Sequence, residues 1–493
     1  LPVDKILLDK EGLEADNTSR RDFLKYVGFS TTAAALAACE GPVIKSVPYV
    51  VQPEQIRPGI ANYYATAIAD GFDFASILVK TREGRPIKIE SNKEALDYGS
   101  ANARVHASVL SMYDTKRIQL PKINGKDSSW DELKSEVLFD LDVASKKQGK
   151  VVLLTQTFAS PTTNKIINDL VTKFPNIEHI ILDTVPSSYA VESFKDAYGF
   201  EGLVDYDFNK SDFIVSIDAD FLGDWQGGGY DTKYVSNRVP DRKTGKGRMS
   251  KHVQFESNMT LTGANADIRV PATPTEQKKI LSYIYSEVKG LNSKIKLSPE
   301  HKEKAKFAAD GIKKFGSKAV IISGLDDKNV QDLILDLNNH IKSLATESSA
   351  RLTRTQSGNK VDVFIKELLD GKISGLIAVG VNPVYSLSKG EKLKEAIKNL
   401  DFSLSFSMKE DETSSVCKYI AAAPHYLESW GDYEFKEGHY FLAQPTIRPL
   451  FNTMQFQDFV LSVIGSNKDY YATIKAFWKQ NVLNGRSWNK VLH

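Results

Sequence analysis

The sequence predicts an α/β protein built from parallel sheets with crossover helices. Continuous apolar runs of strand length are followed by Gly, Asp or Ser and then by amphipathic segments such as VQDLILDLNNHI. Runs of this kind are typical of parallel strands covered by helices on both faces. We expect strands at Val151–Leu154, His179–Val185, Asp212–Ile217, Ala319–Ile322 and Leu376–Val379. Since 493 residues exceed one ordinary core, at least two α/β units are expected.

A smaller β-rich region is expected before these units. The stretch ASILVKTREGRPIKIE predicts two alternating strands joined by a turn at residues 83–86, and a helix is expected to begin after Ser129. Pro48, Pro53 and Pro58 indicate an extended connector. We therefore divide the chain into an arm and connector (1–48), a β-rich region (49–125), a first α/β unit (126–275) and a second (276–493).

Composition excludes several classes of protein. The formal charge of +2 argues against nucleic acid as a partner, and no apolar run reaches the roughly 18 residues of a transmembrane helix. The two cysteines, Cys39 and Cys417, are too few for a disulfide framework or for a cysteine-ligated zinc or iron–sulfur site. The eight histidines form no HxxxH or HxH pattern, so no metal site is predicted.

The N-terminal stretch TSRRDFLK matches the twin-arginine export pattern and is followed by a weakly hydrophobic segment. The residues that carry the pattern are Arg20, Arg21, Phe23, Leu24 and Lys25. The pattern predicts export to the periplasmic face of the cytoplasmic membrane. The stretch LAAC, ending at Cys39, resembles a lipobox, so this cysteine is a candidate for acylation; the alternative is a retained, unacylated arm that ties the protein to a membrane complex.

No motif predicts a catalytic, cofactor-binding or metal-binding residue. Gly227–Gly229 lacks the partners of a nucleotide-binding motif and is interpreted as a flexible loop. It opens a polar stretch, 226–263, expected to be a long loop near strand carboxyl ends, where a ligand would bind. The acidic groups Asp218/Asp220 and 410–412 are interpreted as helix caps and solvated strand ends rather than acid–base catalysts.

Several blocks, in order, resemble the molybdopterin oxidoreductases. They are EGRPIKIESN, SVLSMYDTKRIQL followed by WDE, GANADIRVPATPTE, GVNP, and the segment from DFSLSFSMKEDET to YEFKEG. The resemblance covers residues 60–460 and implies that family's α/β fold.

Departures from the family pattern bear on its cofactor. Asn102 stands where the last iron–sulfur cysteine is expected, residues 63–76 contain no cysteine, and no Cys or Ser convincingly supplies a molybdenum ligand. Asparagine cannot replace a thiolate at such a cluster. Given where the sequence stops, the family's C-terminal barrel is expected to be lacking. We therefore expect a fold without its cofactor, with the former cavity filled by side chains.

The opening segments, SRRDFLKYVGFSTTAAALAACEGPV through GRPIKIE, resemble the large peripheral subunit of bacterial alternative complex III. This resemblance implies a non-catalytic scaffold in a membrane complex that passes electrons from quinol to a cytochrome or terminal oxidase. The implied partners are an iron–sulfur domain or subunit, multihaem c-type cytochromes, integral membrane quinol-binding subunits and a terminal oxidase. Iron–sulfur clusters and haems would reside on those partners or on a further C-terminal domain. The alternatives are an active molybdopterin-dependent reductase subunit and an exported α/β binding protein.

Overall fold

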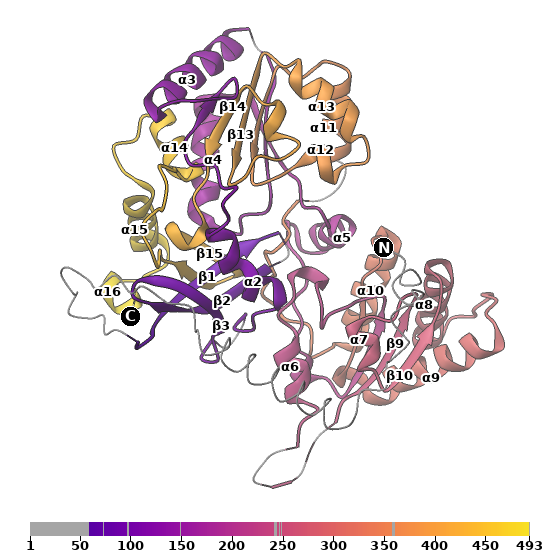
Figure 1. Ribbon diagram of the computed structural model, residues 1–493. Coiled ribbons are helices and arrows are strands. Elements are labelled where there is room, and N and C mark those ends of the chain that lie inside the picture. Colours follow the sequence, from indigo (N-terminus) through magenta and orange to yellow (C-terminus); the bar gives the residue numbers. More distant parts are fainter. Residues whose placement is uncertain are drawn as a thin grey trace, which may run out of the picture. The chain divides into compact units, whose positions relative to one another are not determined.

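The computed structural model describes residues 59–492, apart from 72, 96–97, 148, 241–243, 246, 248 and 357–359 (Figure 1). The chain divides into two units, residues 1–56 and 57–493, and the second contains all of the described residues. The expected twin-arginine residues, Arg20 to Lys25, and Cys39 lie outside the described residues. Among the residues that are described, no helix is long and apolar enough to span a bilayer.

A three-stranded antiparallel sheet opens the described chain. It consists of β1 (Asn62–Asp70), β2 (Asp73–Arg82) and β3 (Arg85–Ser91), so the two strands and turn expected over residues 75–90 are confirmed. Helix α2 (Ala103–Met112) covers one face. Its side chains Val105 and Val109 pack with Val79 and Ile89 of the sheet, which gives this region its own small core.

A seven-stranded sheet forms the larger α/β unit, in the order β5-β4-β14-β13-β12-β6-β7. The strands from β14 to β7 are parallel. Successive side chains of β6 alternate between two cores, Val151 and Leu153 in one and Val152 and Leu154 in the other, which explains the uninterrupted apolar run. The strands are β4 (Lys122–Ile123), β5 (Lys126–Asp127), β6 (Val151–Thr155), β7 (Ile177–Ile181), β12 (Gly375–Val379), β13 (Phe402–Ser407) and β14 (Tyr419–Ala422).

Helices cover both faces of this sheet (Figure 1). One face packs against α3 (Trp130–Lys146), α4 (Pro161–Lys173) and α14 (Phe456–Ile464). The other packs against α11 (Lys360–Leu369) and α13 (Gly390–Lys398). After β14 the chain forms the hairpin of β15 (Gly431–Lys436) and β16 (His439–Ala443). The described chain beyond the hairpin contains helices and connecting loops but no further strand, and its last two helices are α15 (Tyr470–Asn481) and α16 (Trp488–Leu492).

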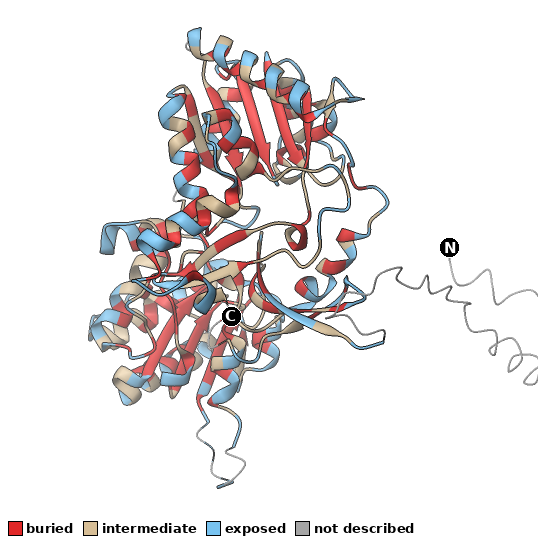
Figure 2. Ribbon diagram, turned by 90° about the vertical axis from the view of Figure 1, so that its left-hand side faces the viewer, coloured by how far each residue is buried: buried red, intermediate tan, exposed pale blue. Residues whose placement is uncertain are grey.

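A four-stranded parallel sheet forms the smaller α/β unit, in the order β10-β9-β8-β11. The strands are β8 (Phe213–Ile217), β9 (Lys251–Glu256), β10 (Ile268–Pro271) and β11 (Ala319–Ser323). Helices α8 (Pro274–Lys289), α9 (Pro299–Phe315) and α10 (Lys328–Ile341) supply the apolar side chains on one face, and α5 (Ser188–Tyr198) contributes Phe194 to the other. The inner strands of both α/β units are buried, and most exposed residues lie on the helices and loops (Figure 2).

The two α/β units are not consecutive in sequence, so the division expected at residues 275 and 276 is wrong. Each sheet takes strands from both sides of that position. The smaller unit is an insertion in the larger one: Leu203 and Arg351, at its entry and exit, exchange backbone hydrogen bonds of 2.9 and 2.8 Å. Apolar runs identify strands but do not reveal which strands pair, because pairing depends on contacts between distant segments.

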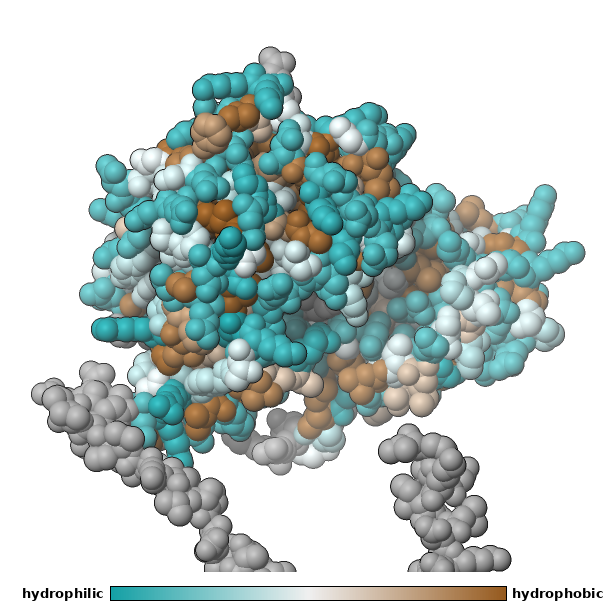
Figure 3. All heavy atoms as spheres, turned by 45° about the horizontal axis from the view of Figure 1, so that its top comes forward, coloured by the Kyte–Doolittle hydropathy of each residue, from teal (hydrophilic) through white to brown (hydrophobic). Residues whose placement is uncertain are grey.

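The long loop expected over residues 226–263 is also wrong in part. This stretch contains α6 (Asp231–Ser236), the central strand β9 and α7 (Leu261–Ala264). Strand β9 was missed because its alternate residues, His252, Gln254 and Glu256, are polar although all three are fully buried. The face of the protein drawn in Figure 3 has apolar side chains scattered among hydrophilic ones, as on an ordinary solvated surface.

Candidate functional site

Each parallel sheet has one point where the direction of strand addition reverses. In the smaller sheet the chain runs from β8 to β9 and β10 on one side and then places β11 on the other side of β8. In the larger sheet β7 lies on one side of β6 and β12 on the other. Ligands of open α/β sheets bind in the crevice at the strand carboxyl ends at such a point. The fold therefore offers two candidate sites.

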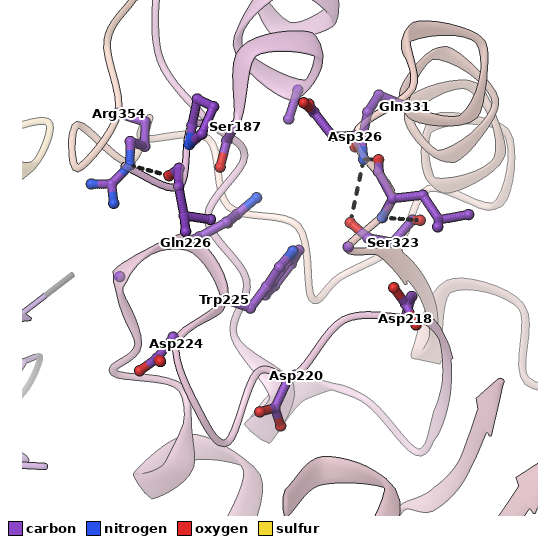
Figure 4. Close-up of a pocket in the computed structure, with 16 residues that line it drawn as sticks. Ser187, Asp218, Asp220, Asp224, Trp225, Gln226, Ser323, Asp326, Gln331 and Arg354 are labelled. Atoms are coloured by element: carbon purple, nitrogen blue, oxygen red, sulfur yellow. Dashed lines mark hydrogen bonds between the residues drawn. The ribbon is translucent and has the colours of Figure 1, made fainter. Parts of the chain in front are cut away.

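The first site is a cavity of about 260 Å³ at the carboxyl ends of β8 and β11. Figure 4 shows Trp225 near its middle, with the carboxylates of Asp220 and Asp224 below, Asp218 to the right and Asp326 above. Asp220 accepts hydrogen bonds from the hydroxyl (2.6 Å) and amide (3.0 Å) of Thr262. This fixed acidic side chain lies where the sequence predicts only a capped strand end.

Backbone geometry at this site depends on close packing. Asp218 follows β8 with φ of 60°, a left-handed conformation, and its carbonyl oxygen would lie 2.2 Å from a Cβ added at Gly324. The Gly227–Gly229 run, interpreted from sequence as a flexible loop, lies in a turn that packs closely against other segments. All three glycines have positive φ, a Cβ at Gly227 would lie 2.8 Å from the Phe74 ring, and the Arg351 guanidinium donates to the Gly228 carbonyl. These contacts require glycine.

The charges of the first site are mostly negative. Burial raises the pKa of Asp218 and of Asp326. The one cationic side chain lining the cavity, Arg354, is buried and already donates to the carbonyl oxygens of Val185 (3.1 Å) and Thr353 (2.6 Å). The cavity therefore presents four carboxyl groups, of which Asp224 is ion-paired with Arg104 at 2.6 Å, and one engaged guanidinium.

The second site is a cavity of about 430 Å³ at the carboxyl ends of β6 and β12. Its walls include the aromatic side chains of Phe158, Phe406, Phe456, Tyr426 and Tyr433. Gly380 follows β12 in the left-handed region, with φ of 63°, and Asn382 caps the short helix α12 (Pro383–Ser386). The expectation that side chains fill the former cofactor cavity is wrong, because two cavities are open at the carboxyl ends of the sheets.

The titratable groups in the second cavity are held by the protein itself. Burial lowers the pKa of His425 to about 4, so this imidazole is neutral near pH 7. Its Nε2 lies 3.0 Å from both the Ser108 carbonyl oxygen and the Ser111 hydroxyl, and its Nδ1 accepts from the Leu427 amide. Asp70, an exposed residue at the end of β1, accepts from the Gln156 side-chain amide at 3.1 Å. With both imidazole nitrogens engaged, the geometry favours a structural histidine.

The acidic group at 410–412 serves local structure, as the sequence predicts. The Asp411 carboxylate accepts from the Ser414 amide at 2.7 Å, and Glu412 accepts from the Asn382 side chain at 2.7 Å. Glu410 forms an exposed ion pair with Lys122 at 3.4 Å.

Asn102 also has a structural role in the described chain. Its side-chain oxygen accepts from the Val105 amide and caps α2, and its Nδ2 donates to Asp73 at 2.6 Å. Arg104 binds the same carboxylate at 2.8 Å and Asp224 at 2.6 Å. The position of the expected cluster ligand is therefore occupied by a hydrogen-bonded helix cap.

The residues present do not fit a molybdopterin dinucleotide with a thiolate-bound metal. Cys417 is buried, donates to the Thr413 carbonyl oxygen, and has its pKa raised to about 12 by burial, so it remains a thiol. Within the described ranges, no group of three or more His, Cys, Asp or Glu side chains could hold a metal ion. The acidic first cavity also opposes a polyphosphate by charge repulsion.

Two lining residues that sequence reasoning missed are Trp225 and Arg354. Trp225 begins a 3-10 turn directly before the stretch interpreted as a loop, and Arg354 lies in a segment without a recognisable motif. Arg354 reaches the cavity because the chain, after the smaller unit, comes back to lie beside β7.

No family model matches the chain. It is 21% identical, over 505 residues, to the molybdopterin-binding-like subunit of menaquinone reductase from Nitratidesulfovibrio vulgaris, a match that covers 90% of this chain and 72% of the relative. Its structure is similar to acetylene hydratase from Pelobacter acetylenicus, with a TM-score of 0.60 and 13% identity over 81% of this chain and 69% of the hydratase. The likeness confirms the predicted α/β fold class.

Proposed function

We propose that this chain is a non-catalytic subunit of a membrane-associated, quinone-linked respiratory complex. The similarity to a menaquinone reductase subunit along 90% of the chain carries the quinone-linked part of this proposal. The relative is itself described as molybdopterin-binding-like, which agrees with a fold used as a scaffold.

The non-catalytic part rests on the chemistry of the two cavities. The first presents four carboxyl groups and one engaged arginine, and the second presents a neutral histidine with both ring nitrogens hydrogen bonded. A catalytic acid or base needs a pKa suited to its task and access to the reacting proton. His425, with a pKa of about 4 and no free nitrogen, meets neither need.

The finer assignment is to an alternative complex III that oxidises quinol at the periplasmic face after twin-arginine export. Its partners would be an iron–sulfur domain or subunit, multihaem c-type cytochromes, quinol-binding membrane subunits and a terminal oxidase. The direction of electron flow distinguishes this assignment from a menaquinone reductase. Assays of the purified complex with quinol plus an oxidised cytochrome, and with quinone plus a reduced donor, would separate the two.

An active molybdopterin-dependent reductase is the second candidate, favoured by the open cavity of about 430 Å³. The test is metal analysis of the complex isolated from membranes in mild detergent. A scaffold predicts molybdenum far below one atom per chain together with co-purifying haem. Stoichiometric molybdenum in this chain would overturn the non-catalytic role, and recovery of the chain alone, without haem-bearing partners, would favour a binding protein.

A further inference from the structure

The end of the three-stranded sheet that carries the β2–β3 turn has several exposed apolar side chains. We call this end the sheet tip and define it by Ile60, Tyr63, Lys80, Arg82, Glu83, Arg85, Ile87, Lys88, Glu90 and Tyr113. Four large apolar residues are about half exposed there: Ile60 (56%), Tyr63 (50%), Ile87 (48%) and Tyr113 (46%).

Strand pairing and one side-chain hydrogen bond hold these residues at the same end of the sheet. Tyr63 is paired with Lys80 across β1 and β2, and Lys80 with Lys88 across β2 and β3. The Tyr113 hydroxyl donates to the Pro86 carbonyl oxygen at 2.8 Å, which holds this side chain against β3. The apolar groups therefore surround one turn rather than being spread over the protein.

The sheet tip is rigid because its other face is packed. Val79 and Ile89 are fully buried against Val105 and Val109 of α2. The core between the sheet and α2 is therefore filled by other side chains, and Tyr63 and Ile87 remain exposed to solvent. The three strands and α2 can be located together in Figure 1.

The charge of the tip is positive. Lys80, Arg82, Arg85 and Lys88 stand against Glu83 and Glu90, which gives four cations, two anions and a net charge of +2. The Lys88–Glu90 pair, at 3.0 Å, is exposed, and Lys80 Nζ lies 5.7 Å from the centroid of the Tyr63 ring. Tyrosine rings beside lysine and arginine, together with exposed isoleucines, are a composition that binds the interface of an anionic bilayer.

The start of the described chain lies at the same place. The Arg82 guanidinium donates to the carbonyl oxygen of Gly59 at 3.3 Å. The described chain therefore begins beside Arg82, at the end of β2.

We propose that the sheet tip docks on an anionic lipid surface, with Ile60 and Ile87 entering the headgroup region and Arg82 and Arg85 contacting lipid phosphates. The inference rests on the proposed peripheral membrane role.

The test is sedimentation of the purified full chain with vesicles of phosphatidylcholine and phosphatidylglycerol at about 7 to 3, and with phosphatidylcholine alone. The intact chain is expected to bind the anionic vesicles and to be released by salt. The variant Arg82→Glu/Arg85→Glu is expected to bind at least about tenfold more weakly. Lys302→Glu/Lys314→Glu, which makes the same change of charge on the exposed face of α9, is expected to bind like the intact chain.

An uncharged pair of variants tests the apolar contribution. Ile87→Ser is expected to weaken binding about threefold or more, and Val363→Ser, at a similarly exposed position of α11, to have no effect. Residues 1–58 are the same in all variants, so differences in vesicle binding between them report the contribution of the sheet tip. Equal binding by tip and control variants, or no vesicle binding by the intact chain, would overturn the proposal and leave a protein partner as the occupant. Neither result changes the molybdenum content that tests the proposed function.

Discussion

At the scale of single residues, one network of buried charges lies away from the two cavities. Asp205, Glu347, Arg351 and Lys436 form one network in which Lys436 Nζ lies 3.0 Å from Asp205 and also binds Glu347. The guanidinium of Arg351 lies over the rings of Tyr98 and Tyr230, at 4.9 and 4.4 Å. Because these four residues come from distant segments, the network joins the inserted unit to the β15–β16 hairpin.

Replacing Lys436 with methionine should be strongly destabilising. The change removes one cation from Asp205 and Glu347 in a buried setting, and breaking a buried pair costs about 3–5 kcal/mol. Urea unfolding followed by circular dichroism measures the loss. Lys88→Met, which breaks the exposed pair with Glu90, should change the free energy of unfolding by less than about 1 kcal/mol. Equal losses in the two variants would contradict this account of the network.

Glu347 makes stability depend on acid pH. Burial alone would raise its pKa, but the ammonium groups of Lys436 and Lys210 lower it from 4.5 to about 2. The folded state therefore binds fewer protons than the unfolded state, so this contribution is fully present above pH 4.5 and is lost as the pH falls toward 2. In Glu347→Gln the free energy of unfolding should be lower at pH 7 and should fall less steeply between pH 4.5 and 2. An unchanged slope in the variant would mean that other carboxyl groups set the acid sensitivity.

At the scale of elements, each α/β sheet closes one edge with a side-chain amide. On β11, Asn338 accepts from the Ile321 amide at 3.1 Å and donates to its carbonyl oxygen at 2.7 Å. On β7, Gln356 makes the same two bonds to Ile181, at 2.9 and 2.7 Å. Each amide thus takes the place of a neighbouring strand and protects an edge that could otherwise pair with another chain.

Asn338→Ala should expose this function. It leaves the buried N–H and C=O of Ile321 without partners, at a cost of about 1–3 kcal/mol each. Thermal unfolding should show the loss, and light scattering should show more aggregation. Asn339→Ala, one residue further along α10 and exposed, is the matched control and should be neutral within about 0.5 kcal/mol. Aggregation of both variants alike would argue against edge protection.

The elements differ in how far the sequence predicts them. Apolar runs identify β6, β8, β11 and β12 because both faces of these strands are buried in apolar cores. Strand β9 escapes the same reasoning because a hydrogen-bonded row, His252 to Gln254 at 3.1 Å and Gln254 to Glu256 at 3.2 Å, fills one of its faces. The residues that line the cavities are harder to predict from the sequence than the strands are. Asp218 and Asp220 could be placed at a strand end, but Arg354 reaches the cavity only through tertiary contacts.

At the scale of the whole described fold, insertion of one α/β unit into the other determines which parts can fold alone. The chain leaves the larger unit after β7 and returns beside it, where Arg354 donates to the Val185 carbonyl oxygen at 3.1 Å. The residues of the smaller unit's two apolar clusters all lie between residues 194 and 352. Its core is therefore complete without the rest of the chain.

A fragment of residues 186–353 should accordingly fold as a cooperative monomer, whereas residues 276–493 should not. The first fragment holds β8 to β11 with α5 and α8 to α10, so both faces of its sheet are covered. The second has β11 without its neighbour β8 and β12 without its neighbour β6, and the exposed parallel edges cannot be satisfied. Circular dichroism and calorimetric unfolding of the two fragments measure the difference. A cooperative transition in 276–493 and none in 186–353 would show that folding follows the order of the sequence, and the paired entry and exit at Leu203 and Arg351 would then be only a local contact.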